Sequence, residues 1–315
     1  MTTLLARRLI QLPLILALVF VITFTLAWAV PGDPLRATDG RKPQPEVEAA
    51  MRAQYNLDDP VAFAFNYLGD ALTGDFGPSL QYPGQRVADI IGDALPVSAT
   101  LGVTAIALAL LLGTTAGVLG ALKPRSPLDA GSLGVALLGI SLPSFVTGTL
   151  LLALGAGLAR QLAPDLTWLH LPLGGWTGPA NLILPALALG LAPAAYIARL
   201  TRLGLADVMA SDYLRTARAK GLSNRQALFR HALKNAFLPV LSFLGPATAS
   251  AMTGSFVIEQ VFNIPGLGEH FVNAVRNKDQ FLLLGIVLVY AALLIAFNLL
   301  VDLAYAFVDP RISLD

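Results

Sequence analysis

Hydrophobic residues occur along the chain in long uninterrupted stretches separated by shorter polar segments. Five of these stretches lack charge and are long enough to cross a bilayer as helices, which takes about 20 residues. They cover residues 9–30, 94–122, 130–159, 235–258 and 281–301. A sixth, at 182–198, is shorter, and it reaches full length if Arg199 and Arg202 extend toward the lipid headgroups. The pattern therefore predicts an all-α membrane protein with six transmembrane helices.

The first stretch has features of a secretory signal, because Arg7 and Arg8 precede it and small residues lie near its end. A signal peptide usually has an apolar core of about 7–15 residues. The stretch at 9–30 is longer than that. We therefore expect residues 1–30 to form a retained transmembrane helix.

Composition supports a membrane setting and excludes several kinds of site. The chain is 55% hydrophobic and 13% charged, whereas a soluble domain is about 25% charged. The net charge of +1 gives no reason to expect nucleic acid as a partner. Without cysteine there is no disulfide, thiolate metal site or cysteine nucleophile, and the three histidines are widely scattered. We expect no metal, no bound cofactor and no catalytic site in this chain.

The distribution of Lys and Arg predicts the orientation. With the N-terminus inside, cytoplasmic segments hold 13 Lys/Arg and external segments hold 8, so both termini are expected in the cytoplasm. The predicted organisation is an N-terminal helix at 1–30, an external segment at 31–93, a membrane domain at 94–308 and a cytoplasmic tail at 309–315. Segments 160–180 and 259–280 are then external. Within 31–93, residues 45–57 predict a short amphipathic helix with Val47, Met51, Tyr55 and Leu57 on one face.

One cytoplasmic connector concentrates positive charge. Residues 215–239, "RTARAKGLSNRQALFRHALKNAFLP", hold six Lys/Arg and no carboxylate. The pattern predicts one amphipathic helix over 206–220, ended by Gly221, and a second helix that begins near Asn224 after a capping box of Ser223 and Gln226. The result is a helix–turn–helix elbow over residues 206–235. Contact with anionic lipid explains the charge but not the defined turn, and a docking site for a cytoplasmic protein explains both.

Absent motifs narrow the function. The chain has no G-x-x-x-x-G-K-[ST] sequence, so we expect no P-loop and no ATP binding of that kind. Apart from Asp302, the predicted spans hold no ionisable residue, whereas ion-coupled carriers keep such groups within the membrane. A channel or secondary carrier stays open as an alternative. A membrane-embedded enzyme is a further alternative, but the sequence offers no convergent polar cluster for one.

The connector also carries a family resemblance. "YLRTARAKGLSNRQALFRHALKNAFLPV" resembles the coupling motif of binding-protein-dependent ABC import permeases, in the form found in the oligopeptide/dipeptide/nickel subfamily. Residues 215–217 stand where that motif has Glu-Ala-Ala, and Gly221 matches its glycine. The pair Leu238-Pro239 comes later than the generic spacing. The subfamily signature RHxLxN fills the interval with Arg230, His231, Leu233 and Asn235.

Stretches outside the connector are similar to the same subfamily. They include "QYNLDDPV", "GDFGPSL", "VFNIPGLGEHFVNAV" and "NLLVDLAYAFVDPRI", so the resemblance covers nearly the whole chain in order. It is closest in kind to the first of the two paired permease subunits, in which a sizeable external segment follows the first span.

The resemblance implies a function and a set of partners. The chain would form half of the translocation pore of an ATP-driven importer in a bacterial or archaeal plasma membrane and would not itself be an enzyme. The implied partners are a second homologous permease subunit, two ATPase subunits or domains that bind ATP and Mg, an external substrate-binding protein, and membrane lipid. Di- and oligopeptides are the implied substrates, with nickel chelates or oligosaccharides as alternatives.

The candidate site residues follow from the elbow and the spans. The residues expected to couple the chain to the ATPases are Asp212, Arg215, Ala217, Lys220, Gly221, Arg230, His231 and Asn235. Pore-lining candidates are Ser141, Ser144 and Asn298. Asn298 and Asp302 share one helical face, and we expect them to make hydrogen bonds between helices.

Overall fold

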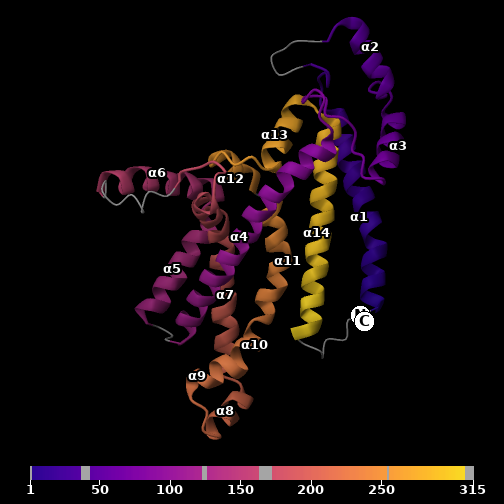
Figure 1. Cartoon of the computed structure of the whole chain (residues 1–315). Coiled ribbons are helices and arrows are strands. Elements are labelled where there is room, and N and C mark those ends of the chain that lie inside the picture. The colour runs from indigo at the N-terminus through magenta and orange to yellow at the C-terminus, as the bar shows by residue number, and fades with distance from the viewer. Residues whose placement is uncertain (1, 37–42, 123–125, 163–171, 254, 309–315) are drawn as a thin grey trace. The chain divides into compact units, whose positions relative to one another are not determined.

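The computed structural model of the chain describes residues 2–36, 43–122, 126–162, 172–253 and 255–308. The predicted tail at 309–315 and the predicted cytoplasmic residues Lys123 and Arg125 lie outside the described residues. Within the described part every regular element is a helix, and the one isolated β-bridge pairs Pro78 with Arg86. The fold class predicted from the sequence is therefore confirmed (Figure 1).

The chain divides into two compact units. One comprises residues 99–264 and 296–308 and contains the predicted elbow; we call it the elbow unit. The other comprises residues 2–98 and 265–295, and we call it the aromatic unit. Two long helices contribute to both units, namely α4 (Val87–Leu122) and α14 (Gln280–Val308).

Four helices are long and apolar enough to cross a membrane. These candidate spans cover Ile10–Ala29, Val87–Leu122, Pro179–Met209 and Gln280–Ala304. They match four of the six predicted spans, although α4 begins seven residues before the predicted position 94 and continues through Pro96. Shorter apolar helices lie within the other two predicted spans, at Ser144–Gly155 and Leu238–Met252.

The predicted single helix over 130–159 is wrong. The structure has two helices there, α5 (Pro127–Ser141) and α6 (Ser144–Leu162), and α6 leaves the direction of α5 at a steep angle (Figure 1). Pro143 causes the break, because it has no amide hydrogen and disfavours the helical conformation of Leu142 before it. The new helix starts at once, with the amides of Val146 and Thr147 donating to the Pro143 carbonyl at 3.0 and 3.1 Å.

The predicted boundary between the fourth span and the elbow is also wrong. Helix α7 (Ile183–Met209) follows the short 3₁₀ turn η2 (Pro179–Leu182) and runs well beyond residue 198. It therefore takes in the first residues of the predicted 206–220 helix. The helix ends where Ser211 adopts an extended backbone and its hydroxyl donates to the Val208 carbonyl at 2.5 Å. A separate helix, α8 (Asp212–Ala219), then begins.

Tight contacts between helices organise the elbow unit. A Cβ on Gly113 would lie 2.5 Å from the Ala194 carbonyl oxygen, and one on Gly117 would lie 2.6 Å from the Ala198 carbonyl oxygen. Helices α4 and α7 therefore touch backbone to backbone, as small residues permit in membranes. A Cβ on Gly245 of α11 (Leu238–Thr253) would lie 2.7 Å from Asn298 Oδ1 of α14.

Aromatic rings form the centre of the aromatic unit. The predicted amphipathic helix is present as α2 (Pro45–Gln54), and α3 (Pro60–Ala71) follows it. Tyr67 of α3 stacks on Phe20 of α1 (Thr2–Ala29). The ring centroids of Phe63 of α3 and Phe281 of α14 are 5.0 Å apart. Leu57 is buried in the same cluster, whereas Val47, expected on that face, is half exposed. The unit also contains α13 (Leu267–Asn277), and neither α13 nor α3 was predicted.

Candidate functional site

The elbow begins with the short amphipathic helix α8. Leu214 is fully buried, whereas Arg215 and Asp212 on the same helix are 75% and 96% exposed. These two side chains approach each other only to 3.4 Å. Such an exposed pair contributes little stability, so the polar face of α8 is available to a binding partner.

Gly221 makes the turn, as the sequence predicts. Its φ is +90°, a conformation that residues with a Cβ rarely adopt. The Gly221 amide donates to the Arg218 carbonyl at 2.9 Å and the Leu222 amide donates to the Ala217 carbonyl at 3.3 Å. This pair of bonds is a Schellman motif, which satisfies the last carbonyls of α8 and reverses the chain.

The predicted capping box is confirmed in both of its hydrogen bonds. The Gln226 amide donates to Ser223 Oγ at 3.3 Å, and the Ser223 amide donates to Gln226 Oε1 at 3.1 Å. The second arm starts there as α9 (Asn224–Ala227). Because two caps enclose only Gly221 and Leu222, the angle of the elbow is fixed by local chemistry.

The second arm contains a π-helical turn that the sequence did not reveal. Residues Leu228–Ala232 form η3 between α9 and α10 (Leu233–Ala236), and α11 follows directly. The wider turn leaves Leu228 and Ala232 buried while Arg230 and His231 are exposed. Single π-turns within helices occur frequently at functional sites. The subfamily signature RHxLxN begins in this turn.

A small apolar core holds the two arms against the end of α7. Its buried members are Leu205, Leu214, Ala227, Leu228, Ala232 and Ala236. A Cβ on Gly204 would lie 2.7 Å from the Ala236 carbonyl oxygen, so α7 and α10 are in direct backbone contact. Asn235 Nδ2 donates to the Tyr213 hydroxyl at 2.9 Å, which links the two arms, and Arg218 donates to the Met209 carbonyl at 3.4 Å, which links the first arm to α7. The elbow is thus connected to both neighbouring helices.

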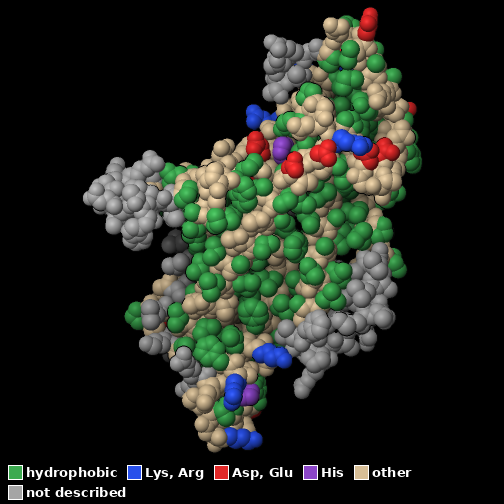
Figure 2. All heavy atoms as spheres, in the orientation of Figure 1, with side chains coloured by type: hydrophobic (Ala, Val, Ile, Leu, Met, Phe, Trp, Pro, Cys, Tyr) green, Lys and Arg blue, Asp and Glu red, His purple; other side chains and the backbone are tan. Residues whose placement is uncertain are grey.

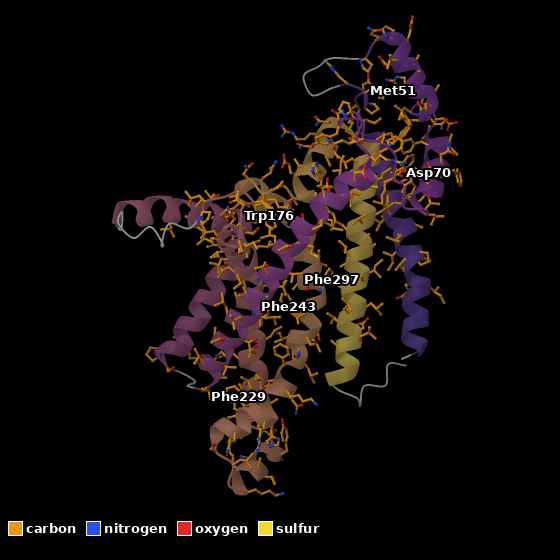
Figure 3. All side chains as sticks on the ribbon, in the orientation of Figure 1. Met51, Asp70, Trp176, Phe229, Phe243 and Phe297 are labelled. Carbon is orange, nitrogen blue, oxygen red and sulfur yellow. The ribbon has the colours of Figure 1, made fainter. Side chains whose placement is uncertain are left out.

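The outer surface of the elbow is basic and partly aromatic. Lys220, Arg230, His231 and Lys234 are exposed, and Figure 2 shows basic and histidine side chains at the end of the unit that holds α8 and α9. Phe229, marked on the elbow in Figure 3, is 55% exposed, and Tyr213 is 45% exposed. Aromatic and Arg side chains are enriched in protein interfaces. The sequence analysis identified the charges but missed both aromatic residues.

The three pore candidates lie on separate elements. Ser141 ends α5 and Ser144 begins α6, so both flank the break at Pro143. Asn298 packs against Gly245 of α11, and its expected hydrogen bond between helices stays a prediction. A lining role for these residues stays a prediction.

An ion pair that the sequence analysis missed joins α5 to α7. Arg202 contacts Asp129 through two parallel hydrogen bonds of 2.5 and 2.8 Å, and Asp129 is only 5% exposed. Arg202 was expected to reach the headgroups and instead has a protein partner. Arg202 lies four residues beyond the predicted span at 182–198, in the part of α7 that continues past it. A bidentate pair of this kind is geometrically specific.

A second buried carboxylate, Asp279, organises the aromatic unit. Its Oδ2 accepts from the Ser79 hydroxyl and from the amides of Leu80 and Gln81 at 3.0 and 3.2 Å. Its Oδ1 accepts from the Leu282 amide at 3.1 Å, which caps α14. Burial raises the pKa of Asp279 above its ordinary value, and these hydrogen bonds act in the opposite direction. Burial also raises the pKa of nearby Tyr67, and the charge of Asp279 adds to that effect.

Two family models match the chain. One, described as the binding-protein-dependent transport system inner membrane component, matches residues 109–314. The other, for the N-terminal part of the membrane component of such systems, matches residues 1–102. The chain belongs to this family. It is thus a multi-pass inner membrane transport permease, as the resemblance in the sequence implied.

Relatives match this permease over nearly its whole length. It is 42% identical over 294 residues to the dipeptide transport system permease protein DppB of Bacillus subtilis, covering 93% of this chain and 92% of the relative. It is 43% identical over 309 residues to the oligopeptide transport system permease protein OppB of Salmonella typhimurium, covering 97% of each. A crystal structure of an amino acid ABC transporter with histidines has a similar fold. Its TM-score is 0.50 at 18% identity, and the match covers 69% of this chain and 92% of that one.

Proposed function

We propose that this permease is one of two similar subunits that form the translocation pore of an ATP-driven importer of di- and oligopeptides. The names of its relatives, which transport dipeptides and oligopeptides, support the substrate class. An external binding protein delivers the peptide, and two cytoplasmic ATPase subunits or domains supply the energy. In this arrangement both termini and the elbow face the cytoplasm.

The observation that carries the proposal is the construction of the elbow. Exposed basic and aromatic side chains lie on two short helices whose angle is fixed by the Gly221 turn and the Ser223–Gln226 capping box. Contact with lipid alone needs no such geometry. A rigid, charged surface suits a protein partner, whose encounter the charge accelerates.

The elbow is also placed to transmit movement. Its first arm follows α7 after two residues, and its second arm runs through α10 into α11. The buried core around Leu214 and Leu228 makes the two arms move together. The Arg202–Asp129 pair extends the connection from α7 to α5. ATP-driven closure of the ATPases on the elbow then moves α5, α7 and α11 as a group, and these are the helices we expect to open and close the pore.

The test is peptide uptake into proteoliposomes that contain this permease, its partner permease and the ATPases, with binding protein on the outside. Radiolabelled di- and tetrapeptides should accumulate only with ATP inside and binding protein outside. Nickel chelates and oligosaccharides, offered in parallel with their own binding proteins absent, serve as negative controls. Uptake without ATP contradicts the proposal and favours a secondary carrier.

The orientation has its own test, because the chain has no native cysteine. Single cysteines at Val61, which is exposed in α3, and at Lys220 of the elbow should react with an impermeant maleimide from opposite sides of the membrane. Labelling of position 61 from the cytoplasmic side reverses the proposed topology.

A further inference from the structure

A groove in the aromatic unit lies outside everything the coupling role requires. It has a volume of about 300 Å³ and is bordered by helices α1, α13 and α14. Leu26 of α1, Val30 just after α1 and Val275 of α13 all line it, and they are 63, 54 and 49% exposed. Two of the bordering helices, α1 and α14, hold candidate membrane spans. The groove is therefore open on a side of the unit that lipid can reach.

The depth of the groove corresponds to part of one leaflet. Along α14 the lining extends from Gln280 to Val287, and on the other side it extends from Val30, just after α1, back to Thr23. Each interval is about 10 Å long at a helical rise of about 1.5 Å per residue. One leaflet contributes about 15 Å of hydrocarbon. Both helices thus present a mainly apolar wall that matches the upper part of an acyl chain.

Polar groups lie at the end of the groove where α1 ends and α14 begins. Lys278 is held there in a left-handed conformation with φ of 58°, and its ammonium donates to the Val30 carbonyl. Burial lowers the pKa of Lys278, so an anion beside it favours its charged form. Gln280 has a buried Oε1 without a hydrogen-bond partner in the described structure. The mouth of the groove therefore offers one cation to a ligand, whereas the buried Gln280 oxygen is out of a ligand's reach.

We propose that this groove binds a phosphatidylglycerol molecule. One acyl chain lies between α1 and α14, and the phosphate contacts Lys278. Among the described residues of the lining, Lys278 is the one that is ionisable, and a headgroup with a single negative charge matches it. Phosphatidylcholine and phosphatidylethanolamine have the phosphate but carry no net charge. In the proposed orientation the lipid belongs to the outer leaflet.

The structure offers matched variants for the test. Ala27→Phe fills the groove, whereas Ala29→Phe places the same ring on an exposed position of α1 outside the lining. Lys278→Gln removes the charge at the mouth, whereas Arg276→Gln removes an exposed charge two residues earlier on α13. Lys278→Arg retains the charge and checks that a loss in Lys278→Gln does not come from misfolding.

The measurement is native mass spectrometry of the full permease complex titrated with phosphatidylglycerol, phosphatidylethanolamine or phosphatidylcholine. We expect Lys278→Gln and Ala27→Phe to weaken retention of one phosphatidylglycerol roughly tenfold, as expected when a hydrogen bond to a charged group or the space for a ligand is lost. Arg276→Gln, Ala29→Phe and Lys278→Arg should retain it like the parent. Equal retention of the three lipids, or equal retention by all variants, overturns the proposal.

A photo-crosslinking amino acid at Val275 identifies the occupant in the membrane. The expected product is the permease chain with the added mass of phosphatidylglycerol. A crosslink to the partner permease or to the binding protein shows that a protein covers the groove, and it overturns the lipid site. Both experiments report on binding alone, so their outcome is independent of the transported substrate.

Discussion

The elbow and the aromatic unit use charged side chains in opposite ways. In the elbow, Arg215 and Asp212 are 75% and 96% exposed, and their contact is loose. In the aromatic unit, Asp279 is fully buried and accepts four hydrogen bonds from residues that surround it. The first arrangement contributes little to folding, whereas the second fixes the path of a loop and the start of a helix.

The difference indicates which variants separate folding from function. Removal of an exposed charge changes folding stability little, so its main effect is on the affinity for a binding partner. Removing a buried carboxylate leaves its donors without partners, which lowers the free energy of unfolding. Substitutions in the elbow should therefore leave the stability of the permease unchanged and impair its assembly with the ATPases. Substitutions at buried charges should lower the stability of the permease itself.

The largest effect is expected for Asp279→Ala. The substitution leaves the Ser79 hydroxyl and the Leu80 and Gln81 amides unsatisfied and removes the cap of α14, which should cost about 3 kcal/mol or more of unfolding free energy. Thermal unfolding in detergent measures the loss. Asp70→Ala, at an exposed position marked in Figure 3, is the control. Equal stability of the two variants contradicts the claim that the buried carboxylate stabilises the fold more than exposed charges do.

A somewhat smaller effect is expected for Arg202→Gln. It leaves Asp129 buried without its cation, which should cost about 3 kcal/mol for a fully buried pair and less here because Arg202 is 26% exposed. Arg199→Gln, at an exposed position of the same helix, should be neutral. Arg202→Gln should also lower the abundance of the permease in the membrane. The double variant Asp129→Arg with Arg202→Asp should recover part of that abundance. No recovery shows that the pair does not act as an interaction between α5 and α7.

Gly221→Val should leave stability nearly intact and impair coupling. A Cβ at this position has open space, so the cost is backbone strain of about 1–2 kcal/mol, confined to the turn. We expect normal abundance in the membrane, loss of co-purifying ATPase and loss of peptide uptake. Gly221→Asn is the control, since Asn tolerates the left-handed conformation better. Parental transport by Gly221→Val contradicts a coupling role for the turn.

The smallest effect is expected for Arg230→Ala. This side chain is exposed on the π-turn, and its removal should weaken ATPase docking by about 1 kcal/mol or less, more at low salt than at high salt. A titration of ATPase binding at two ionic strengths measures both quantities. An effect that does not depend on salt indicates that Arg230 acts through packing.

What the sequence predicted was encoded by neighbouring residues. The turn at Gly221 and the Ser223–Gln226 capping box depend on residues within a few positions of each other, and both were confirmed. Four spans followed from uninterrupted apolar runs. These signals need no knowledge of distant contacts.

What the sequence did not predict depends on residues far apart or on small backbone choices. Asp279 meets Ser79 across 200 positions, and Arg202 meets Asp129 across 73. Pro143 is a local signal for the helix break, but the uninterrupted apolar run around it favoured a single span. The π-turn at Leu228–Ala232 places Leu228 and Ala232 in one core with Leu205 and Leu214, and no local pattern specifies that core.

Site-specific crosslinking tests the central claim, that the elbow is where the ATPases dock. Single cysteines replace Arg230 on the π-turn and Asp70 in the aromatic unit, in a chain that has no other cysteine. Membranes with the whole importer are treated with a short bifunctional maleimide. The account predicts that position 230 is crosslinked to an ATPase subunit and position 70 is not. Absence of any ATPase crosslink at position 230, with the ATPases present and transport active, contradicts it.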